Sequence, residues 1–276
     1  MIRLDRKIAK IIPYRTIFFP TEETVHRVLS QAAIPHLLRL FWTDIEAEIT
    51  PKILRHERTA TVRLDLTRPL GETFQNIAKS GRYDIRQAEK LTDRVSITRN
   101  ESRFADDFLA LYNSFAKSKG EISSIKKESF ERYREHADNF LAYYDNRPMC
   151  GHVLLRDEAG GRARLLFSAS RRLEERDAAR ICGLLNRFLH WHEICFYRDQ
   201  GFALYDFGGI REDSTDGISR FKLSFGGERV AEHTYLCANT PMLMRSALLI
   251  FAVLRARSTS FRRTGITASI YDKHSN

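Results

Sequence analysis

The apolar positions of this chain follow two periods, one typical of strands and the other typical of helices. Residues 61–66 alternate between apolar and charged side chains, which predicts a half-buried strand. Residues 104–117 carry apolar side chains three and four positions apart, which predicts an amphipathic helix. Apolar positions nearly encircle residues 177–197, so this helix is expected to be buried, with Asp177 as its cap.

The order of these elements predicts the fold class. A helix is expected from residue 24 to near Pro35, and another over residues 71–91 with a break at Ser80-Gly81. Three strands are expected in the middle of the chain, at residues 139–144, 149–156 and 163–170. The buried helix and a strand at 202–207 follow, and a strand–helix–strand unit with short loops predicts a parallel pair. We therefore expect an α/β (mixed α+β) fold in which helices flank a central mixed sheet.

Two glycine pairs mark the segment with the strongest chemical signal. Residues 205–210 read YDFGGI and residues 220–227 read RFKLSFGG. Glycine pairs mark places where the backbone turns sharply or approaches another group closely. The pattern predicts strand, loop and strand, with Asp206 and Lys222 on or near the loop. The same pattern also fits ordinary strand-end turns whose charges are solvated.

These two motifs resemble the Fem family, the aminoacyltransferases that build peptidoglycan interpeptide bridges, and related acyltransferases found with envelope polysaccharide genes. Two further stretches match: RYDIRQAEK at residues 82–90 resembles the basic helix of that family, and LHWHEI at residues 189–194 resembles the helix before its glycine motif. The resemblance runs in order from about residue 61 to residue 228. It implies a GNAT-like acyltransferase fold and transfer of an acyl or aminoacyl group to an amine of a cell-envelope precursor.

The resemblance also implies where the chemistry lies. The lysine of the glycine motif falls on Lys222, which would supply positive charge to an oxyanion or a phosphate. Asp206 would orient or deprotonate the amine, and backbone amides near Gly208 and Gly209 would donate further hydrogen bonds. The alternative for Lys222 is a surface lysine on an edge strand.

A basic helix face is the candidate for phosphate binding. Lys79, Arg82, Arg86 and Lys90 are spaced three, four and four apart and so share one face. Arginine grips phosphate through its planar fork, although such a stripe also occurs as a solvated face. We expect substrate or phosphate contacts from Arg82, Tyr83 and Arg86 of this helix and, elsewhere in the chain, from Arg171, Tyr205, Gly208 and Gly209.

The sequence leaves the identity of the acyl donor open. Residues 171–178 lack the glycines with which acetyl-CoA-dependent relatives wrap pyrophosphate, which argues against acetyl-CoA. Residues 1–60 are expected to be an N-terminal segment, too short for a second full domain and at most a remnant of one; this argues against aminoacyl-tRNA. The transferase domain is expected at residues 61–240. An acyl-CoA, an acyl carrier protein or an aminoacyl-tRNA would serve as its co-substrate, and no permanently bound cofactor is expected.

Charge favours anionic partners. The net charge is +10, which suits nucleic acid, acidic lipid head groups or phosphorylated substrates. Residues 241–276 are expected to be a basic helix and tail that either lies on an anionic membrane or packs on the sheet. The second hypothesis is therefore a non-catalytic module of the same fold that docks on membrane or nucleic acid.

Other classes of site receive little support. The four cysteines have no metal-ligand spacing and are expected to be reduced, which favours a cytoplasmic protein, at most peripheral to the membrane. There is no phosphate-binding loop motif, nucleophile elbow or HExxH sequence. His190 and His192 point about 200° apart on a helix, so one is expected to be packed and the other exposed, without a metal.

Overall fold

The chain divides into two compact units. The computed structural model describes residues 1–8, 12–31, 36–91, 93–102, 104–119, 124–173, 176–210 and 216–238. The first unit combines Met1–Thr61 with Val230–Asn276, and the second is Val62–Arg229. Strands β4 (Ile53–Asp65) and β10 (Glu228–Cys237) contribute residues to both units. The basic tail expected at 241–276 lies outside the described residues.

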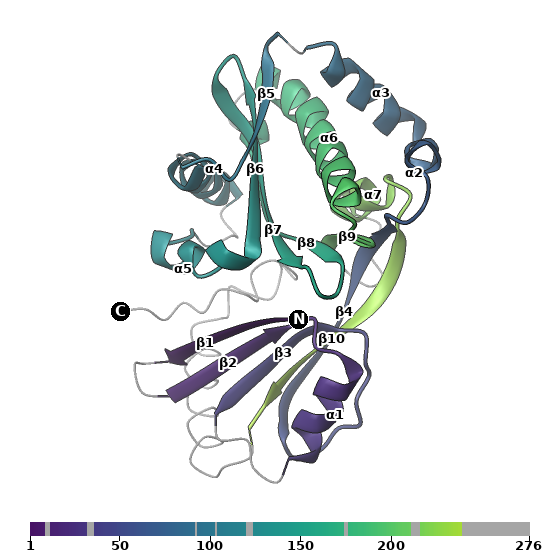
Figure 1. Ribbon diagram of the computed structural model, residues 1–276. Helices are drawn as coiled ribbons and strands as arrows, with labels where there is room; N and C mark the ends of the chain where they lie inside the picture. Colours follow the sequence, from purple (N-terminus) through teal and green to yellow (C-terminus); the bar gives the residue numbers. More distant parts are fainter. Residues whose placement is uncertain are drawn as a thin grey trace. The chain divides into compact units, whose positions relative to one another are not determined.

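The first unit is a sheet with one helix packed on it. Its strands follow the order β1-β2-β3-β10-β4, where the first three are β1 (Ile2–Ile8), β2 (Ile12–Phe18) and β3 (Leu37–Thr43). β1 pairs antiparallel with β2, and β2 pairs parallel with β3. Helix α1 (Glu22–Ser30) connects this parallel pair, and its Val25 and Val28 pack against Leu38, Leu40 and Tyr235 of the sheet (Figure 1).

The helix expected from residue 24 to Pro35 is shorter than predicted. Thr21 caps α1 by accepting a hydrogen bond from the Thr24 amide, and the helix ends at Ser30. β3 follows at Leu37, because its run of apolar side chains lies between two neighbouring strands and becomes buried on both faces.

The second unit contains the mixed sheet that the sequence predicts. Its order is β4-β9-β8-β7-β6-β5. Its remaining strands are β5 (Val95–Arg99), β6 (Ala137–Tyr144), β7 (Arg147–Asp157), β8 (Arg162–Ser170) and β9 (Leu204–Ile210). The pairs from β5 to β8 are antiparallel, and β8 and β9 form a parallel pair. A mixed sheet flanked by helices is thereby confirmed.

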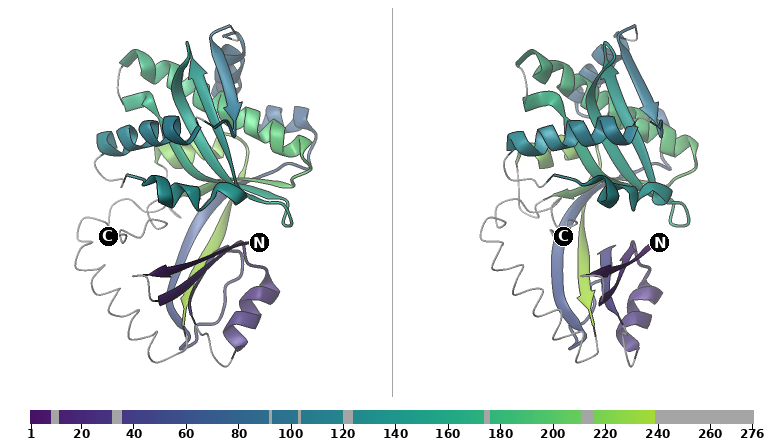
Figure 2. Two further views of the ribbon diagram at one scale, coloured as in Figure 1. Left: turned by 60° about the vertical axis from the view of Figure 1, so that its left-hand side comes forward. Right: turned by 90° about the vertical axis from the view of Figure 1, so that its left-hand side faces the viewer.

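Helices cover both faces of this sheet. Among the residues that the structure describes, these helices are α2 (Leu70–Asn76), α3 (Lys79–Glu89), α4 (Phe104–Lys119), α5 (Lys127–Glu131), α6 (Arg176–Asp199) and α7 (Gly217–Leu223). The short 3-10 helices Arg134–His136 and Arg171–Leu173 precede β6 and α6. α4 and α5 lie on one face, α6 lies on the other, and α3 packs on α6 (Figure 1). The right-hand view of Figure 2 looks onto the face that carries α4.

Two helix boundaries differ from the sequence prediction. The break expected at Ser80-Gly81 falls instead at Ile77, where α2 ends, and Gly81 lies buried inside α3. A Cβ at Gly81 would lie 2.8 Å from Ile77 Cγ2 and 3.1 Å from Arg187 Nη1, so this glycine serves helix packing. α6 already begins at Arg176, so Asp177 is inside its first turn and is not its cap.

The second glycine motif forms a helix, not the predicted strand. α7 begins after Asp216, whose side chain accepts a hydrogen bond from the Ser219 amide at 2.7 Å. Gly226 and Gly227 then allow close backbone approach, because a Cβ on either would lie within 3 Å of Asn76 or Arg63 backbone oxygen. Gly226 and Gly227 thus allow the chain after α7 to pack closely against α2 and β4.

All four cysteines are free thiols, in agreement with the expectation that they are reduced, and Cys150, Cys182 and Cys237 are buried. Within the described ranges, none of the helices is long and apolar enough to cross a membrane.

Candidate active site

The candidate site is built where strands β8 and β9 stop pairing. Their parallel ladder joins Arg162–Arg164 to Leu204–Asp206, and both strands continue beyond it, to Ser170 and Ile210. β8 is also irregular at this point, because Val153 pairs with Phe167 while the next residue of β7 pairs with Leu165. A β-bulge at the end of a ladder commonly redirects side chains near a site. The first glycine motif lies on β9 beside it.

Gly208 holds the two strands close at the end of the ladder. Its φ is +75°, a conformation that side chains rarely adopt. A Cβ there would lie 2.8 Å from the carbonyl oxygen of Leu165 on β8. The residue at this position must therefore be glycine for β9 to approach β8 in this way.

Replacing Gly208 with alanine is expected to destabilise the second unit. Backbone strain of this kind costs about 1–3 kcal/mol, and the contact with the Leu165 oxygen adds to it. Urea unfolding measures the change. Gly183, a helical glycine on α6 with open space around it, is the matched control. Gly183→Ala should stabilise slightly, and equal effects at the two glycines would contradict this role for Gly208.

Lys222 extends from α7 to the carbonyl groups of the first glycine pair. Its Nζ donates hydrogen bonds to Gly208 O at 3.1 Å and to Gly209 O at 2.8 Å, and the side chain is partly exposed. The residue is on a helix, so the alternative of a lysine on an edge strand does not apply. The geometry places one ammonium charge at the end of the β8–β9 ladder.

Asp206 lies in the interior, where it holds the turn in place. Its carboxylate is fully buried and pairs with Arg164 Nη1 at 2.8 Å and with Arg63 Nε at 3.5 Å. Its other oxygen accepts a hydrogen bond from the Gly208 amide at 2.8 Å. A carboxylate enclosed in this way fixes the conformation of β9 and gives a substrate amine no direct access.

A buried network that the sequence did not predict lies beside this strand. The Glu193 carboxylate accepts hydrogen bonds from His152 Nδ1 at 2.8 Å and from the Tyr205 hydroxyl at 2.5 Å. His152 Nε2 lies 3.0 Å from Asn186 Oδ1, so both of its ring nitrogens face oxygen atoms. His190 Nδ1 lies 2.8 Å from the Tyr205 hydroxyl. Tyr205, an expected substrate contact, is therefore a fully buried member of this network.

The charges of this network are set by burial and by mutual pairing. Burial alone would raise the pKa of Glu193, but the charge and hydrogen bonds of His152 and His190 lower it to about 2. Burial, together with the charge of His152, lowers the pKa of His190 to about 4. Burial and the charge of Glu193 raise the pKa of Tyr205 well above its usual value. At neutral pH the network thus holds an ionised Glu193, a neutral His190 and a protonated Tyr205.

Three members of this network, His152, His190 and Glu193, are the metal-ligand candidates among the described residues. The ligand atoms of His152, His190 and Glu193 lie within 4.8 Å of one another. However, both Glu193 oxygens lie 2.5–2.8 Å from nitrogen or hydroxyl donors, which is hydrogen-bond geometry. Proton sharing therefore explains this arrangement without an ion. His190 is buried and His192 is exposed, as their helical spacing predicts.

Acid is expected to unfold the protein partly through His190. Its pKa is about 4 when folded and about 6.5 when unfolded, so the unfolded state binds the proton first as the pH falls. This contribution to stability is complete above pH 6.5, and about 2 kcal/mol of it is lost between pH 7 and pH 5. Urea unfolding at both pH values should show a smaller loss for His190→Gln than for the wild type. The exposed His26 supplies the control: His26→Gln should keep the wild-type pH dependence.

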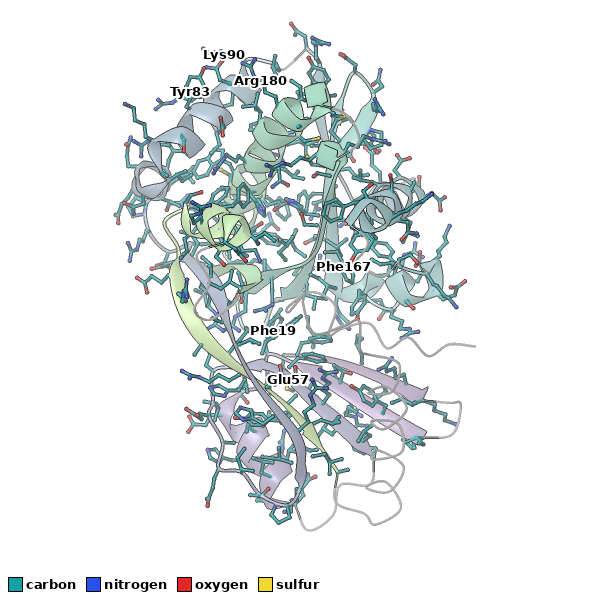
Figure 3. All side chains as sticks on the ribbon, turned by 180° about the vertical axis from the view of Figure 1, so that it is seen from behind. Phe19, Glu57, Tyr83, Lys90, Phe167 and Arg180 are labelled. Carbon is teal, nitrogen blue, oxygen red and sulfur yellow. The ribbon has the colours of Figure 1, made fainter. Side chains whose placement is uncertain are left out.

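The basic face of α3 is only partly available for a ligand. Arg82 Nη1 donates hydrogen bonds to the Gln75 and Ile77 carbonyl oxygens at 2.5 and 2.6 Å, so this side chain caps α2. Arg86 is exposed with its guanidinium 5.4 Å from the Phe74 ring, and Tyr83 is 58% exposed. Figure 3 shows Tyr83 and Lys90 on the outer side of α3.

Arg171 also has a structural contact. It begins the short helix before α6, and its Nε donates a hydrogen bond to the Pro148 carbonyl oxygen at 2.7 Å. The expected site residues thus fall into three groups: Lys222 with the glycine pair, the buried Asp206 and Tyr205, and the surface residues of α3 with Arg171. The structure brings only the first group and Asp206 together around the end of the ladder.

Comparison with solved structures identifies the fold. No family model matches the sequence, and no curated protein matches it. The structure is similar to that of FemX, with a TM-score of 0.60 and 15% identity over 87% of this chain and 85% of FemX. It is also similar to the C-terminal domain of a protein described as a lysylphosphatidylglycerol synthetase from Agrobacterium fabrum, with a TM-score of 0.53 and 13% identity over 87% and 82% of the two chains. The chain therefore has a mixed α/β fold similar to that of FemX, in agreement with the resemblance of its motifs to the Fem family.

Proposed function

We propose that this protein is an acyl- or aminoacyl-transferase that acts on an amine of a cell-envelope precursor. The observation that carries the proposal is the position of Lys222, whose ammonium contacts the Gly208 and Gly209 carbonyl groups where β8 and β9 stop pairing. The likeness to FemX supports the fold on which this arrangement is built. The donor would lie along the backbone of β8 and β9 beyond their ladder.

The reaction needs few groups from the protein. The unprotonated amine attacks the acyl carbonyl carbon, and negative charge develops on the carbonyl oxygen. Lys222 would stabilise that oxyanion. The bond from the acyl carbon to its carrier then breaks, an amide remains, and the proton of the amine passes to the leaving group or to water. We assign Asp206 to positioning, because it holds Gly208 from the interior.

The strand pairing supports a donor site in the second unit and gives no support for one in the first unit. In the first unit, β1, β2, α1 and β3 follow the same order as β7, β8, α6 and β9, namely an antiparallel pair and then a parallel pair joined by a helix. This likeness supports residues 1–60 as the remnant of a related domain. However, β2 and β3 pair through Phe18 and Phe41, whose rings stack 5.2 Å apart at the end of the ladder. The β2–β3 ladder thus reaches the last residue of β2, whereas the β8–β9 ladder ends at Arg164, well before the end of β8 at Ser170.

A thermal-shift screen tests the function. Acetyl-CoA, a long-chain acyl-CoA, UDP-sugars and short RNA are the probes, because a ligand that binds the native state raises the melting temperature. The proposal expects stabilisation by a CoA ester or a UDP-sugar, and loss of that stabilisation in Lys222→Ala. Stabilisation that persists in Lys222→Ala would contradict the site.

The second candidate function is a docking module without catalysis. It is favoured by the net charge of +10 and by the exposed cations of α3, of which Lys79, Arg86 and Lys90 are examples. Binding to RNA or to anionic vesicles should then weaken steeply as salt rises, because counterions are released on binding. A small substrate held in a transferase site should keep most of its affinity. The salt dependence therefore separates the two functions.

A further inference from the structure

A polar cavity lies at the end of strands β8 and β9 opposite the Lys222 site. Its volume is about 330 Å³, and its lining includes Gly161, just before β8, and Phe202, just before β9. Lys222 and the glycine pair lie toward the carboxyl ends of these strands. Phe196 in the last turn of α6 and Gln200 just after this helix also line the cavity. This cavity is thus separate from the proposed transfer site and was not indicated by any sequence motif.

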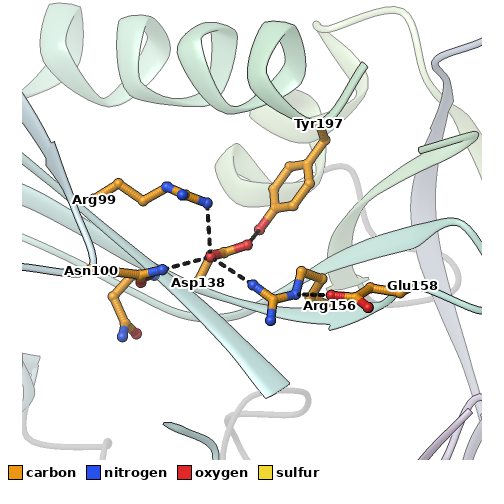
Figure 4. A network of polar contacts seen from close by, with 7 residues as sticks. Arg99, Asn100, Asp138, Arg156, Glu158 and Tyr197 are labelled. Carbon is orange, nitrogen blue, oxygen red and sulfur yellow. Dashed lines mark hydrogen bonds and ion pairs between the residues drawn. The ribbon is translucent and has the colours of Figure 1, made fainter. Parts of the chain in front are cut away.

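A fully buried carboxylate, that of Asp138, organises the charged side of this cavity. Its Oδ1 accepts hydrogen bonds from Asn100 Nδ2 at 2.8 Å, Arg156 Nη1 at 3.1 Å and Arg99 Nη1 at 3.3 Å (Figure 4). Its Oδ2 accepts a hydrogen bond from the Tyr197 hydroxyl at 3.0 Å. One carboxylate therefore meets two guanidinium groups, which leaves a local excess of one positive charge.

The remaining acid of the cavity compensates this excess only weakly. Glu158 pairs with Arg156 Nε at 3.0 Å, but its side chain is 73% exposed. Water screens an ion pair at such a position, so its contribution to the local potential is small. The charge balance of the cavity therefore favours an anion over a cation.

Aromatic side chains supply an apolar wall beside these charges. The Arg99 guanidinium lies 4.3 Å from the centroid of the Phe196 ring, and Phe202 also lines the cavity. A guanidinium held against a ring keeps its planar fork in a defined orientation, and such a fork matches the two oxygens of a carboxylate. The cavity volume is near the lower end of the range for small-molecule sites.

We propose that this cavity binds a small monoanion, a carboxylate attached to a flat apolar body. The carboxylate would accept hydrogen bonds from Arg99 and Arg156, and the body would pack against Phe196 and Phe202. One negative charge on the ligand matches the single excess positive charge of the cavity. This proposal does not depend on the transferase function.

Calorimetric titration of the full chain with benzoate tests the proposal, with benzamide as the uncharged control of the same shape. Benzoate should bind saturably and benzamide should bind much more weakly. Equal binding of the two compounds, or no saturable binding of benzoate, would overturn the proposal.

Three variants locate the binding. Arg99→Gln should weaken benzoate binding roughly tenfold, because a charge-assisted contact is lost. Arg94, an exposed arginine that pairs with Asp145, provides the control, and Arg94→Gln should leave the affinity unchanged. Glu158→Gln should leave the benzoate affinity nearly unchanged, because water already screens this exposed carboxylate. An Arg99→Gln variant that still unfolds cooperatively on heating yet binds benzoate like Arg94→Gln would contradict the assignment. A Glu158→Gln variant with much tighter binding would contradict the charge balance of the cavity.

Discussion

Replacing Lys222 with methionine is expected to lower the turnover number about 10²- to 10³-fold, the usual cost of removing one group that stabilises an oxyanion. Methionine retains much of the length of the side chain and removes its charge. The loss should appear in kcat, because the ammonium acts mainly on charge that develops in the transition state. Steady-state kinetics with the donor and acceptor that yield product measure it.

A matched lysine distinguishes this effect from a general loss of charge. Lys90, an exposed residue at the end of α3, is the control, and Lys90→Met should retain wild-type turnover. Circular dichroism of Lys222→Met should match that of the wild type, because the lysine contacts carbonyl groups at a partly exposed position. A folded Lys222→Met variant with normal kcat would remove Lys222 from the mechanism.

Replacing Asp206 with asparagine is expected to destabilise the second unit by about 3–5 kcal/mol, the cost of breaking a buried ion pair by removing one partner. The change is nearly isosteric, so the loss reports charge and not volume. Arg164 is almost fully buried and would lose the carboxylate that lies 2.8 Å from its Nη1. Urea unfolding at pH 7 measures the difference in the free energy of unfolding.

The exposed pair between Arg94 and Asp145 is the control for this measurement. Both side chains are more than half exposed, so Asp145→Asn should change the unfolding midpoint very little. If Asp206 had only a catalytic role, Asp206→Asn would lose activity at unchanged stability. That result would contradict the positioning role that its burial indicates.

The sequence predicted the central sheet well because local signals and tertiary packing agree there. The turn at Asp145-Asn146 is one example: both residues adopt positive φ, which asparagine and aspartate tolerate better than most residues, and they join β6 to β7. α6 is another, because its nearly encircling apolar positions correspond to a helix packed against the sheet on one side and α3 on the other. Elements of this kind are specified by their own pattern.

The errors fall where tertiary contacts decide the conformation. α7 has only seven residues and depends on the Asp216 cap and on the close approach of Gly226 and Gly227 to their neighbours, which no local periodicity reveals. The run from Leu37 to Trp42 reads equally as buried helix or buried strand, and its neighbours in the sheet determine that it is a strand.

The geometry of the candidate site could be predicted only in part from the sequence. The glycine pair and Lys222 are adjacent in space, but the burial of Asp206 follows from Arg63 and Arg164 on two other strands. The one signal that could have indicated the histidine network is polar: His152 interrupts an apolar strand, and Glu193 lies in a helix with apolar residues almost all round. Buried polar residues require partners, and only the fold shows which they are.

Mass spectrometry of the reaction products shows whether this protein transfers an acyl group to an amine. The purified protein is incubated with an acyl-CoA, an acylated carrier protein or an aminoacyl-tRNA, each with amine-bearing envelope precursors, and the products are searched for a new amide. We expect an acylated amine with the wild type and with Lys90→Met, and little or none with Lys222→Met. No product from any donor, or equal product from Lys222→Met, would rule out the transfer mechanism proposed for Lys222.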